Sequence, residues 1–231
     1  MLEVSGLNQY YGGSHTLWDV EFEVERGSCV CIMGRNGVGK TTLLKAIMGL
    51  LPIRSGRIHF EGDDLMGQPP AVRARKGIAY VPQGREIFPE LTVEENLRVG
   101  LAARPGKKRG IPERVFELFP VLKKMMHRKG GNLSGGQQQQ LAIGRALAIE
   151  PALLILDEPT EGIQPNIVQE IGEILTRLNR EQNLTVLLVE QKLLFARRVA
   201  HSFYLMDKGR TVAGGRIGEL GDELIKQHLR V

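Results

Sequence analysis

The sequence predicts an α/β fold with a central, largely parallel sheet, a flanking antiparallel β layer and an inserted α-helical subdomain. Short apolar runs alternate with helical patterns through most of the chain, which is typical of folds built on parallel strands. The first fifty residues instead alternate polar and apolar positions, as antiparallel strands do when one face meets water. Residues 84–150 contain several helical patterns and no convincing strand. These three observations define the expected architecture.

Five apolar runs are expected to form the central sheet. They are CVCIM (29–33), GIAYV (77–81), ALLIL (152–156), TVLLV (185–189) and SFYLM (202–206). Patterns of helical period lie between them, in TLLKAIMGLL (42–51) and IVQEIGEILTRL (167–178). Because parallel strands need crossover connections, which are usually helices, this order favours parallel pairing.

The antiparallel layer is expected from three amphipathic runs, EVSGL (3–7), LWDVEFEVERG (17–27) and RIHFEG (57–62). The helical subdomain is expected from two patterns, TVEENLRVGLA (92–102) and PERVFELFPVLKKM (112–125). We therefore expect an α/β core made of residues 1–83 and 151–231, with residues 84–150 inserted as the helical subdomain.

Composition indicates an ordinary globular domain. The chain has 231 residues, 42% of them apolar, and a formal charge of +5. It can therefore bury a sizeable core, and no nucleic-acid partner is expected. Its two cysteines, Cys29 and Cys31, share one face of an expected strand and are interpreted as small core residues. No signal-peptide pattern and no run of about 18 apolar residues occurs, so we expect a cytoplasmic protein that reaches a membrane through a partner.

The strongest chemical signal is GRNGVGKTT at 34–42, which matches G-x-x-x-x-G-K-[ST] between an expected strand and an expected helix. Its glycines allow a tight loop whose backbone N–H groups and helix terminus face a polyphosphate. Lys40 is expected to reach the β- and γ-phosphates, and the Thr41 hydroxyl to bind Mg²⁺. The strand-loop-helix context disfavours a glycine-rich turn without a ligand, so the core is expected to be of the P-loop NTPase type.

Two adjacent carboxylates, Asp157 and Glu158, follow the strand ALLIL. Asp157 is suited to a magnesium shell, and Glu158 is suited to orienting or deprotonating an attacking water. Either residue alone would be interpreted equally well as part of an acidic turn with no catalytic role. Beside a phosphate loop, we interpret the pair as catalytic.

The segment NLSGGQQQQLAIGRAL (132–147) begins with a helix-start signal. Ser134 and Gln137 stand in the S-x-x-Q relation of a capping box. A cap alone explains Ser134, but it does not explain Gly135 and Gly136, which are poor helix formers that leave N–H groups open to an anion. We interpret this helix start as a second phosphate-facing site, separate from the phosphate loop.

With these motifs, the sequence resembles the nucleotide-binding domain of ATP-binding cassette transporters over essentially its whole length, 1–231. The phosphate loop, LSGGQ (133–137) and LLILDE (153–158) carry the resemblance. It implies ATP hydrolysis with ATP and Mg²⁺ as cofactors. The nucleotide-binding residues that it implies are Tyr11, Gly34, Asn36, Gly37, Gly39, Lys40, Thr41, Thr42, Gln83, Ser134, Gly135, Gly136 and Gln137.

Two of these residues depend on the resemblance alone. Gln83 in YVPQ stands where the family has a glutamine that senses the metal and the helical subdomain, so the implied metal ligands are Thr41, Gln83 and Asp157. Tyr11 stands where the family stacks an aromatic ring on adenine. Without the resemblance, Tyr11 reads as a core or surface aromatic.

The resemblance also implies a head-to-tail dimer, in which each LSGGQ closes over the ATP held by the other subunit's phosphate loop. ATP joins the two domains and hydrolysis releases them. The implied partners are a second ATPase subunit, identical or paralogous, membrane-spanning permease subunits and, indirectly, an extracytoplasmic solute-binding protein. The implied location is peripheral, on the inner face of the plasma membrane.

Two positions depart from the usual family pattern. Gln164 replaces an aspartate that ordinarily helps to align the two active sites, and Gln191 replaces the histidine that contacts the γ-phosphate. A carboxamide donates a hydrogen bond but does not titrate near neutral pH. We therefore expect Gln191 to support catalysis through a phosphate contact, with capping of the following helix as the alternative, and we expect Glu158 to carry the proton chemistry.

The VEQ strand end and the TEG turn resemble one branch of the family, the ATPase subunits of bacterial importers for branched-chain amino acids and for urea or short amides. VPQGREIFPELTVEENL (81–97) most resembles the urea type. The rival functions are the ATPase of a soluble machine in translation or DNA repair and a non-hydrolysing ATP-gated dimerisation module. The length of the chain disfavours the first, and the presence of Glu158 disfavours the second.

Overall fold

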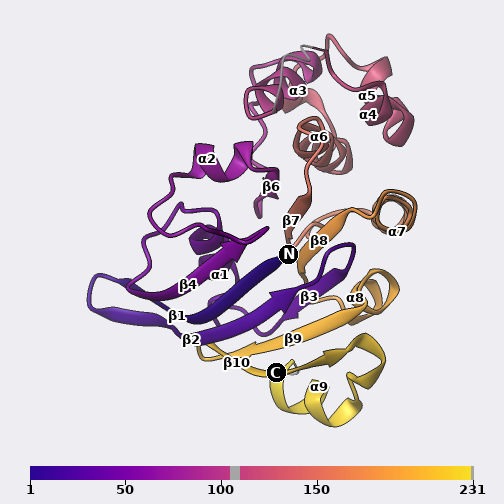
Figure 1. Cartoon of the computed structure of the whole chain (residues 1–231). Coiled ribbons are helices and arrows are strands. Elements are labelled where there is room, and N and C mark those ends of the chain that lie inside the picture. The colour runs from indigo at the N-terminus through magenta and orange to yellow at the C-terminus, as the bar shows by residue number, and fades with distance from the viewer. Residues whose placement is uncertain (105–109, 230–231) are drawn as a thin grey trace.

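The computed structural model describes residues 1–104 and 110–229, which form two sheets and a set of helices (Figure 1). The larger sheet has six strands in the order β10-β9-β3-β8-β7-β6. The strands are β3 (Cys29–Met33), β6 (Ile78–Val81), β7 (Leu153–Asp157), β8 (Thr185–Val189), β9 (Ser202–Asp207) and β10 (Arg210–Arg216). All pairs are parallel except β9 with β10. The five expected central strands are therefore confirmed.

The second sheet is the expected antiparallel layer, with the order β2-β1-β4-β5. Its strands are β1 (Leu2–Tyr11), β2 (Ser14–Val24), β4 (Ser55–Phe60) and β5 (Asp63–Asp64). Alternate residues of β2, such as Val20, Phe22 and Val24, are buried, while the residues between them face solvent. This alternation is what the amphipathic sequence pattern predicts for a sheet with one covered face.

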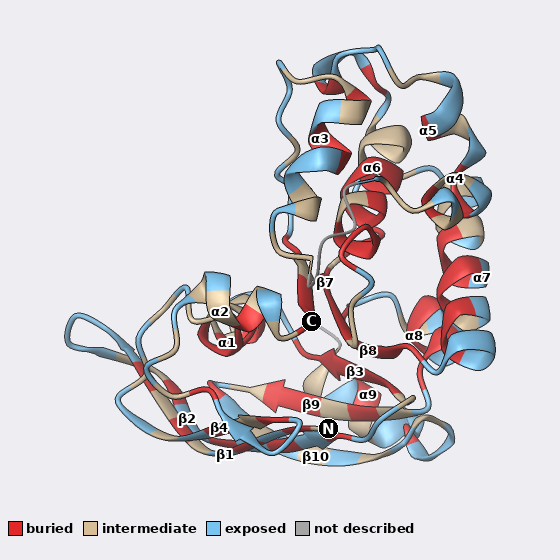
Figure 2. Ribbon diagram, turned by 45° about the horizontal axis from the view of Figure 1, so that its top comes forward, coloured by how far each residue is buried: buried red, intermediate tan, exposed pale blue. Residues whose placement is uncertain are grey.

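The central sheet is buried on both faces because a separate core packs against each one. Val30 and Ile32 of β3 point into the core shared with the antiparallel layer and α1 (Lys40–Ile47). Cys29 and Cys31 point into the other core and are free thiols, as expected. That second core includes residues of α7 (Pro165–Gln182) and α8 (Leu193–Val199). The buried strands between these layers are visible in Figure 2.

Between β6 and β7, the described residues form helices that gather at one end of the molecule (Figure 1). These helices are α3 (Val93–Leu101), α4 (Glu113–Leu118), α5 (Pro120–Lys124), the 3₁₀ helix η1 (Gly130–Asn132) and α6 (Gly135–Leu147). We call them the helical lobe. Residues 105–109, which belong to the expected subdomain 84–150, lie outside the described part of the chain.

The prediction of one helix over residues 112–125 is wrong, because the chain breaks at Phe119 (φ −129°, ψ 74°) between α4 and α5. Pro120 has no N–H for an intrahelical bond, and its ring disfavours helical angles at the preceding residue. The helix expected over 42–51 also ends early, at Ile47, since Gly49 adopts φ +71° just beyond it.

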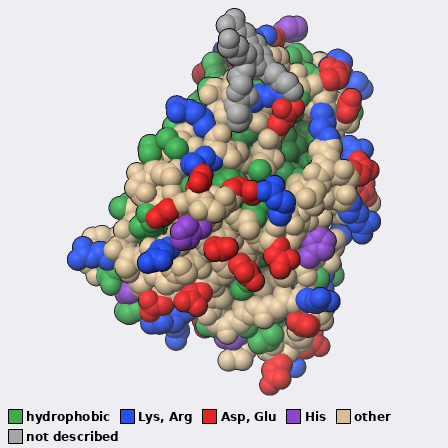
Figure 3. All heavy atoms as spheres, viewed as in Figure 1, with side chains coloured by type: hydrophobic (Ala, Val, Ile, Leu, Met, Phe, Trp, Pro, Cys, Tyr) green, Lys and Arg blue, Asp and Glu red, His purple; other side chains and the backbone are tan. Residues whose placement is uncertain are grey.

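Three short helices complete the described chain: α2 (Pro70–Arg75), the 3₁₀ helix η2 (Ile217–Glu219) and α9 (Asp222–His228). On the face shown in Figure 3, Lys and Arg side chains are interspersed with Asp and Glu side chains. None of the described helices is long and apolar enough to cross a bilayer.

Arg73 on α2 is buried and closes the end of α1. Its guanidinium donates to the carbonyl oxygens of Ala46 (3.0 Å), Ile47 (2.6 Å) and Leu65 (2.7 Å). The Ala46 and Leu65 carbonyls also accept from the backbone N–H groups of Gly49 (3.0 Å) and Gln68 (3.1 Å), so Arg73 adds a second donor to each. Arg73 therefore joins α1, which begins at Lys40, to the segment that follows β4.

We predict that Arg73→Ala lowers the free energy of unfolding by roughly 3 kcal/mol, because it removes the charge-assisted hydrogen bonds of a buried guanidinium to three carbonyl oxygens. Urea denaturation of the nucleotide-free chain measures this change. Arg75→Ala is the control, since Arg75 is exposed on the same helix. Equal stabilities of the two variants would contradict a structural role for Arg73.

Candidate active site

The loop between β3 and α1 is shaped by glycines where no side chain fits. Gly39 adopts φ +104°, and a Cβ there would lie 2.8 Å from Cδ2 of Leu17. A Cβ on Gly34 would lie 2.4 Å from the carbonyl oxygen of Met206. Alanine is therefore disfavoured at Gly34 by the backbone of Met206 and at Gly39 by the left-handed φ, which explains why glycine stands at these two positions.

Lys40 is the first residue of α1, and its ammonium lies under this loop with 5% of the residue exposed. It donates to the carbonyl oxygens of Gly34 (2.8 Å) and Arg35 (2.9 Å) and lies 3.6 Å from Oε1 of Glu158. Burial lowers the pKa of Lys40, and the nearby carboxylate of Glu158 opposes that shift. A polyphosphate offers the same ammonium ionised acceptors, which form stronger hydrogen bonds than carbonyl oxygens do.

The two carboxylates at the end of β7 diverge at a strained residue. Glu158 has φ +47°, an uncommon conformation for a residue with a side chain. Its backbone N–H donates to the carbonyl oxygen of Val189 on the neighbouring strand (2.9 Å). Asp157 is 1% exposed beside Thr41, whereas Glu158 lies near Lys40. The turn therefore gives the adjacent acids different surroundings.

Asp157 lacks the partners that a buried carboxylate usually has. Oδ2 accepts from the Tyr80 hydroxyl (3.4 Å), and Oδ1 has no hydrogen-bond partner among the described residues. Burial raises the pKa of Asp157, and the hydroxyls of Thr41 and Tyr80 oppose that shift. A buried carboxylate oxygen without a donor fits a cation ligand.

The donor set suits Mg²⁺. Mg²⁺ prefers oxygen ligands and is usually held by one or two carboxylates together with substrate phosphates. Asp157 supplies a carboxylate, Thr41 a hydroxyl and Gln83 an amide oxygen. The amide nitrogen of Gln83 donates to Oε2 of Glu161 (2.9 Å), so the oxygen is the atom left to ligate a cation. No cluster of three or more His, Cys, Asp or Glu side chains in the described chain could hold a metal without phosphate oxygens.

Gln191 bridges the phosphate loop and the second carboxylate. Its amide nitrogen donates to Oδ1 of Asn36 (2.5 Å) and to Oε1 of Glu158 (2.6 Å). The side chain therefore does not cap α8, whose first flanking residue, Lys192, makes no side-chain cap either. In this structure Gln191 holds the carboxylate of Glu158, an arrangement that was not expected from the sequence.

Glu190, unlike Gln191, was given no role from the sequence. It is 2% exposed, and Oε1 accepts from the backbone N–H groups of Gln191 (2.8 Å) and Lys192 (2.9 Å). Oε2 accepts from the buried Thr160 hydroxyl (2.7 Å), and Lys192 donates to the Thr160 carbonyl (2.8 Å). Glu190 thus fixes the segment that carries Gln191. A charged residue directly after a fully apolar strand was the available signal.

These groups line one cavity of about 640 Å³. The expected residues along its wall are Asn36, Gly37, Gly39, Lys40, Thr41, Thr42, Gln83, Glu158 and Gln191. Gly34 and Asp157 lie just beneath it, in contact with Lys40 and Thr41 respectively. Tyr11 does not line it, but its hydroxyl lies 3.5 Å from Oγ1 of Thr42 and its ring is half exposed. Tyr11 is therefore placed beside the phosphate loop.

The residues of LSGGQ lie elsewhere. Ser134 and Gln137 form the expected capping box at the start of α6. Ser134, Gly135, Gly136 and Gln137 line a different cavity of about 470 Å³, together with Gln164. The loop at 34–42 and the start of α6 therefore line separate cavities.

Comparison with known proteins places this geometry in context. A family model described as ABC transporter matches residues 17–161. The high-affinity branched-chain amino acid transport ATP-binding protein BraG of Pseudomonas aeruginosa is 45% identical over 213 residues, which cover 92% of this chain and 91% of that protein. The probable branched-chain amino acid transport ATP-binding protein LivF of Archaeoglobus fulgidus is 39% identical over 223 residues, covering 95% and 94%.

Solved structures agree with the sequence relatives. An ATP-binding subunit of an ABC transporter superposes with a TM-score of 0.83 at 32% identity, covering 98% of this chain and 92% of that one. A dimeric ATP-binding cassette in a post-hydrolysis state, bound to ADP and Pi, superposes with a TM-score of 0.84 at 26% identity, covering 94% and 99%.

We predict that Asp157→Asn raises the free energy of unfolding of the nucleotide-free chain by about 0.5 to 2 kcal/mol while weakening Mg²⁺-dependent nucleotide binding. The substitution removes a buried charge that has too few partners. Because burial raises the pKa of Asp157 above its unfolded value, the wild-type chain should likewise gain stability as pH falls through that pKa.

Urea denaturation at pH values above and below the pKa of Asp157 measures the change in stability. The same measurement with and without Mg²⁺ and nucleotide checks the loss of binding. Glu117→Gln serves as the control because Glu117 is an exposed carboxylate on α4. A destabilised Asp157→Asn variant would show instead that attraction to Lys40 outweighs the cost of burial.

Proposed function

The chain belongs to the ATP-binding cassette transporter family as the ATP-hydrolysing subunit of an importer, and from this premise we propose that it drives uptake of branched-chain amino acids through separate permease subunits. Two relatives that match more than nine-tenths of the chain, BraG and LivF, carry branched-chain amino acid transport in their names. The VEQ strand end and the TEG turn, which resemble the same branch, support the assignment.

Urea or a short amide is the second candidate solute. The segment 81–97 supports it, since VPQGREIFPELTVEENL resembles the urea-type subunit. The described cavity of the active site is lined by groups that suit phosphates and by carboxylates, and none of these distinguishes the two solutes. The choice between the solutes therefore rests on the permease and binding protein that this subunit serves. Neighbouring genes for two permeases, a second cassette and a binding protein would identify the importer, and a urease cluster would favour urea.

We assign the catalytic roles as follows. Lys40 and the loop N–H groups hold the β- and γ-phosphates, and Tyr11 stacks on the adenine. Thr41, Gln83 and Asp157 hold Mg²⁺, which supplies charge neutralisation at the phosphates when bound. Glu158 orients and deprotonates the attacking water. The observation that carries this assignment is the convergence of Lys40, Glu158 and Gln191 on one cavity next to the buried Asp157.

A dimer explains why Ser134 to Gln137 face a cavity of their own. One chain provides a complete phosphate loop and, about a hundred residues later, a second helix start with open N–H groups. We propose that the second site closes over the ATP of a second ATPase subunit, identical or paralogous. The solved dimeric cassette with ADP and Pi is consistent with this arrangement.

We further propose that residues 84–150 form the subdomain that contacts the permease. An open groove of about 520 Å³ runs between α2 and the helical lobe, and its walls include Tyr80, Glu86, Phe88 and Val99. Phe88 and Val99 are 45% and 42% exposed, and exposed apolar side chains grouped in a groove are typical of an interaction site. The groove adjoins the loop of Gln83, so a permease segment seated there would sense the nucleotide site. The solute-binding protein would act through the permease.

The function is tested by co-expressing the chain with the permease subunits and the second cassette of its gene cluster. We expect the complex to hydrolyse ATP and to be stimulated by a binding protein loaded with leucine more than by one exposed to urea. Co-purification with ribosomes or DNA in place of permeases would support the soluble-machine alternative.

Glu158→Gln should abolish hydrolysis in this complex and trap an ATP-bound dimer, because the amide retains the hydrogen-bonding shape but does not accept a proton from water. Phosphate release and size-exclusion chromatography measure the two effects. Wild-type turnover in this variant would remove Glu158 from its assigned role, and loss of the dimer would argue against ATP-driven closure.

Gln191→Ala should lower kcat by about 10- to 150-fold, corresponding to about 1.5 to 3 kcal/mol for one hydrogen bond to a charged group. The affinity for ATP should change less, since Lys40 and the loop remain. Steady-state kinetics separates the two quantities, with Gln227→Ala on α9 as the exposed control. An unchanged kcat would mean that the contacts of Gln191 do not matter for turnover.

A further inference from the structure

The loop that follows Gln83 has a strained backbone. Gly84, Arg85 and Glu86 adopt φ of +79°, +73° and +43°, and two of the three carry side chains that disfavour this region. Arg145 of α6 holds the strained backbone from outside, donating to the carbonyl oxygens of Arg85 (3.3 Å) and Glu86 (2.8 Å). Backbone strain persists only where the surrounding structure imposes it, so the contacts around this loop hold it in the strained conformation.

The strained loop aims the side chain of Arg85 between two other segments. Nη1 donates to Oε1 of Gln138 in the first turns of α6 (3.3 Å). Nη2 donates to the carbonyl oxygen of Glu161 in the turn after β7 (3.4 Å). These partners lie 53 and 76 residues away in the chain. One guanidinium therefore joins the loop after β6 to the first turns of α6 and to the turn after β7, which are far apart in the chain.

Glycines make room for this guanidinium on both sides. A Cβ added to Gly135 would lie 3.2 Å from Nη1, and one added to Gly162 would lie 3.7 Å from Nη2. Gln83 reinforces the same junction, because its amide nitrogen donates to the Glu161 carboxylate (2.9 Å). The loop of Gln83 thus contacts both the turn after β7, at Glu161, and the start of α6, where Arg85 bonds Gln138 next to Gly135.

We propose that Arg85 is a positioning residue that couples the chain's own nucleotide site to the signature turn, residues Ser134–Gln137, which serves the nucleotide of the second subunit. This inference rests on the proposed function, since it assigns each turn to a different ATP. When Gln83 engages Mg²⁺, its loop moves, and Arg85 transmits that movement to Gly135 and to the turn at Glu161. A chain without ATP then presents its signature turn in the wrong position for its partner.

The strength and shape of these contacts suit signalling better than stability. Both hydrogen bonds of Arg85 are long, and the side chain is half-buried, so they contribute little to folding. The planar guanidinium reaches two acceptors at a fixed separation, whereas a lysine ammonium would reach one of them. We therefore expect Arg85→Lys to retain only part of the coupling.

The test is hydrogen exchange of the full-length chain, with and without AMP-PNP and Mg²⁺, at a concentration where light scattering shows a monomer. In the wild type, nucleotide should slow exchange in the phosphate loop (34–42) and change it in residues 133–138. In Arg85→Ala, phosphate-loop protection should stay within about twofold of wild type, while the response at 133–138 should fall at least about fivefold.

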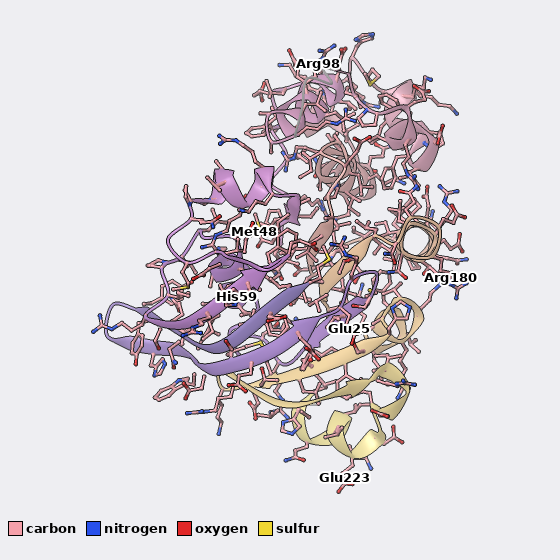
Figure 4. The ribbon with its side chains drawn as sticks, viewed as in Figure 1. Glu25, Met48, His59, Arg98, Arg180 and Glu223 are labelled. Atoms are coloured by element: carbon pink, nitrogen blue, oxygen red, sulfur yellow. The ribbon has the colours of Figure 1, made fainter. Side chains whose placement is uncertain are left out.

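Matched variants separate coupling from a general disturbance. Arg180 is exposed on α7 (Figure 4) and does not line the nucleotide cavity, so Arg180→Ala should behave as wild type in both regions. The Tm of Arg85→Ala should equal that of wild type, and Arg85→Lys should give an intermediate response at 133–138.

Each result decides the matter. An undiminished response at 133–138 in Arg85→Ala would overturn the proposal, as would a wild-type chain whose phosphate loop responds while residues 133–138 do not. A wild-type chain whose phosphate loop gains no protection would instead count against the proposed function. Loss of the response together with a lowered Tm and lost loop protection would reduce Arg85 to a structural residue.

Discussion

The parallel registration of β3, β8 and β7 is the constraint on which the active site depends. Val189 at the end of β8 lies opposite Ile32 of β3 on one side and Asp157 of β7 on the other. The phosphate loop, the paired acids and the VEQ segment therefore leave the sheet at the same level. A shift of one residue in any of the three strands would turn these side chains to the other face.

The sheet brings the three loops close together, and polar contacts beyond the strand ends then fix their positions. The buried carboxylate of Glu190 satisfies two backbone N–H groups and the Thr160 hydroxyl, so the turns after β7 and β8 are held as one unit. Gln191, carried on this unit, meets Glu158 and Asn36. The carboxylate of Glu158 is therefore engaged by an amide on one side and by Lys40 on the other.

The sequence predicted the features that depend on local pattern. The strands follow from continuous apolar runs, and the loop at 34–42 follows from glycine spacing, because both signals act over a few residues. The break at Phe119 was predictable from Pro120 but was missed, since the apolar period continues through it. The contacts of Glu190 and Arg85 were not predictable in this way. Their partners lie far along the chain, and only the tertiary fold reveals which polar groups a buried carboxylate or a strained arginine meets.

The two thiols of this chain have a practical consequence. Cys29 and Cys31 both lie in β3, the strand that leads into the phosphate loop, and burial raises the pKa of Cys29 to about 12. The folded chain therefore resists alkylation and oxidation, because the reactive thiolate is scarce and inaccessible. A thiol-reactive dye would label the protein only when the central strand opens. The rate at which these two thiols are labelled therefore reports how often the nucleotide-binding core opens. A cysteine introduced on the surface could be labelled selectively.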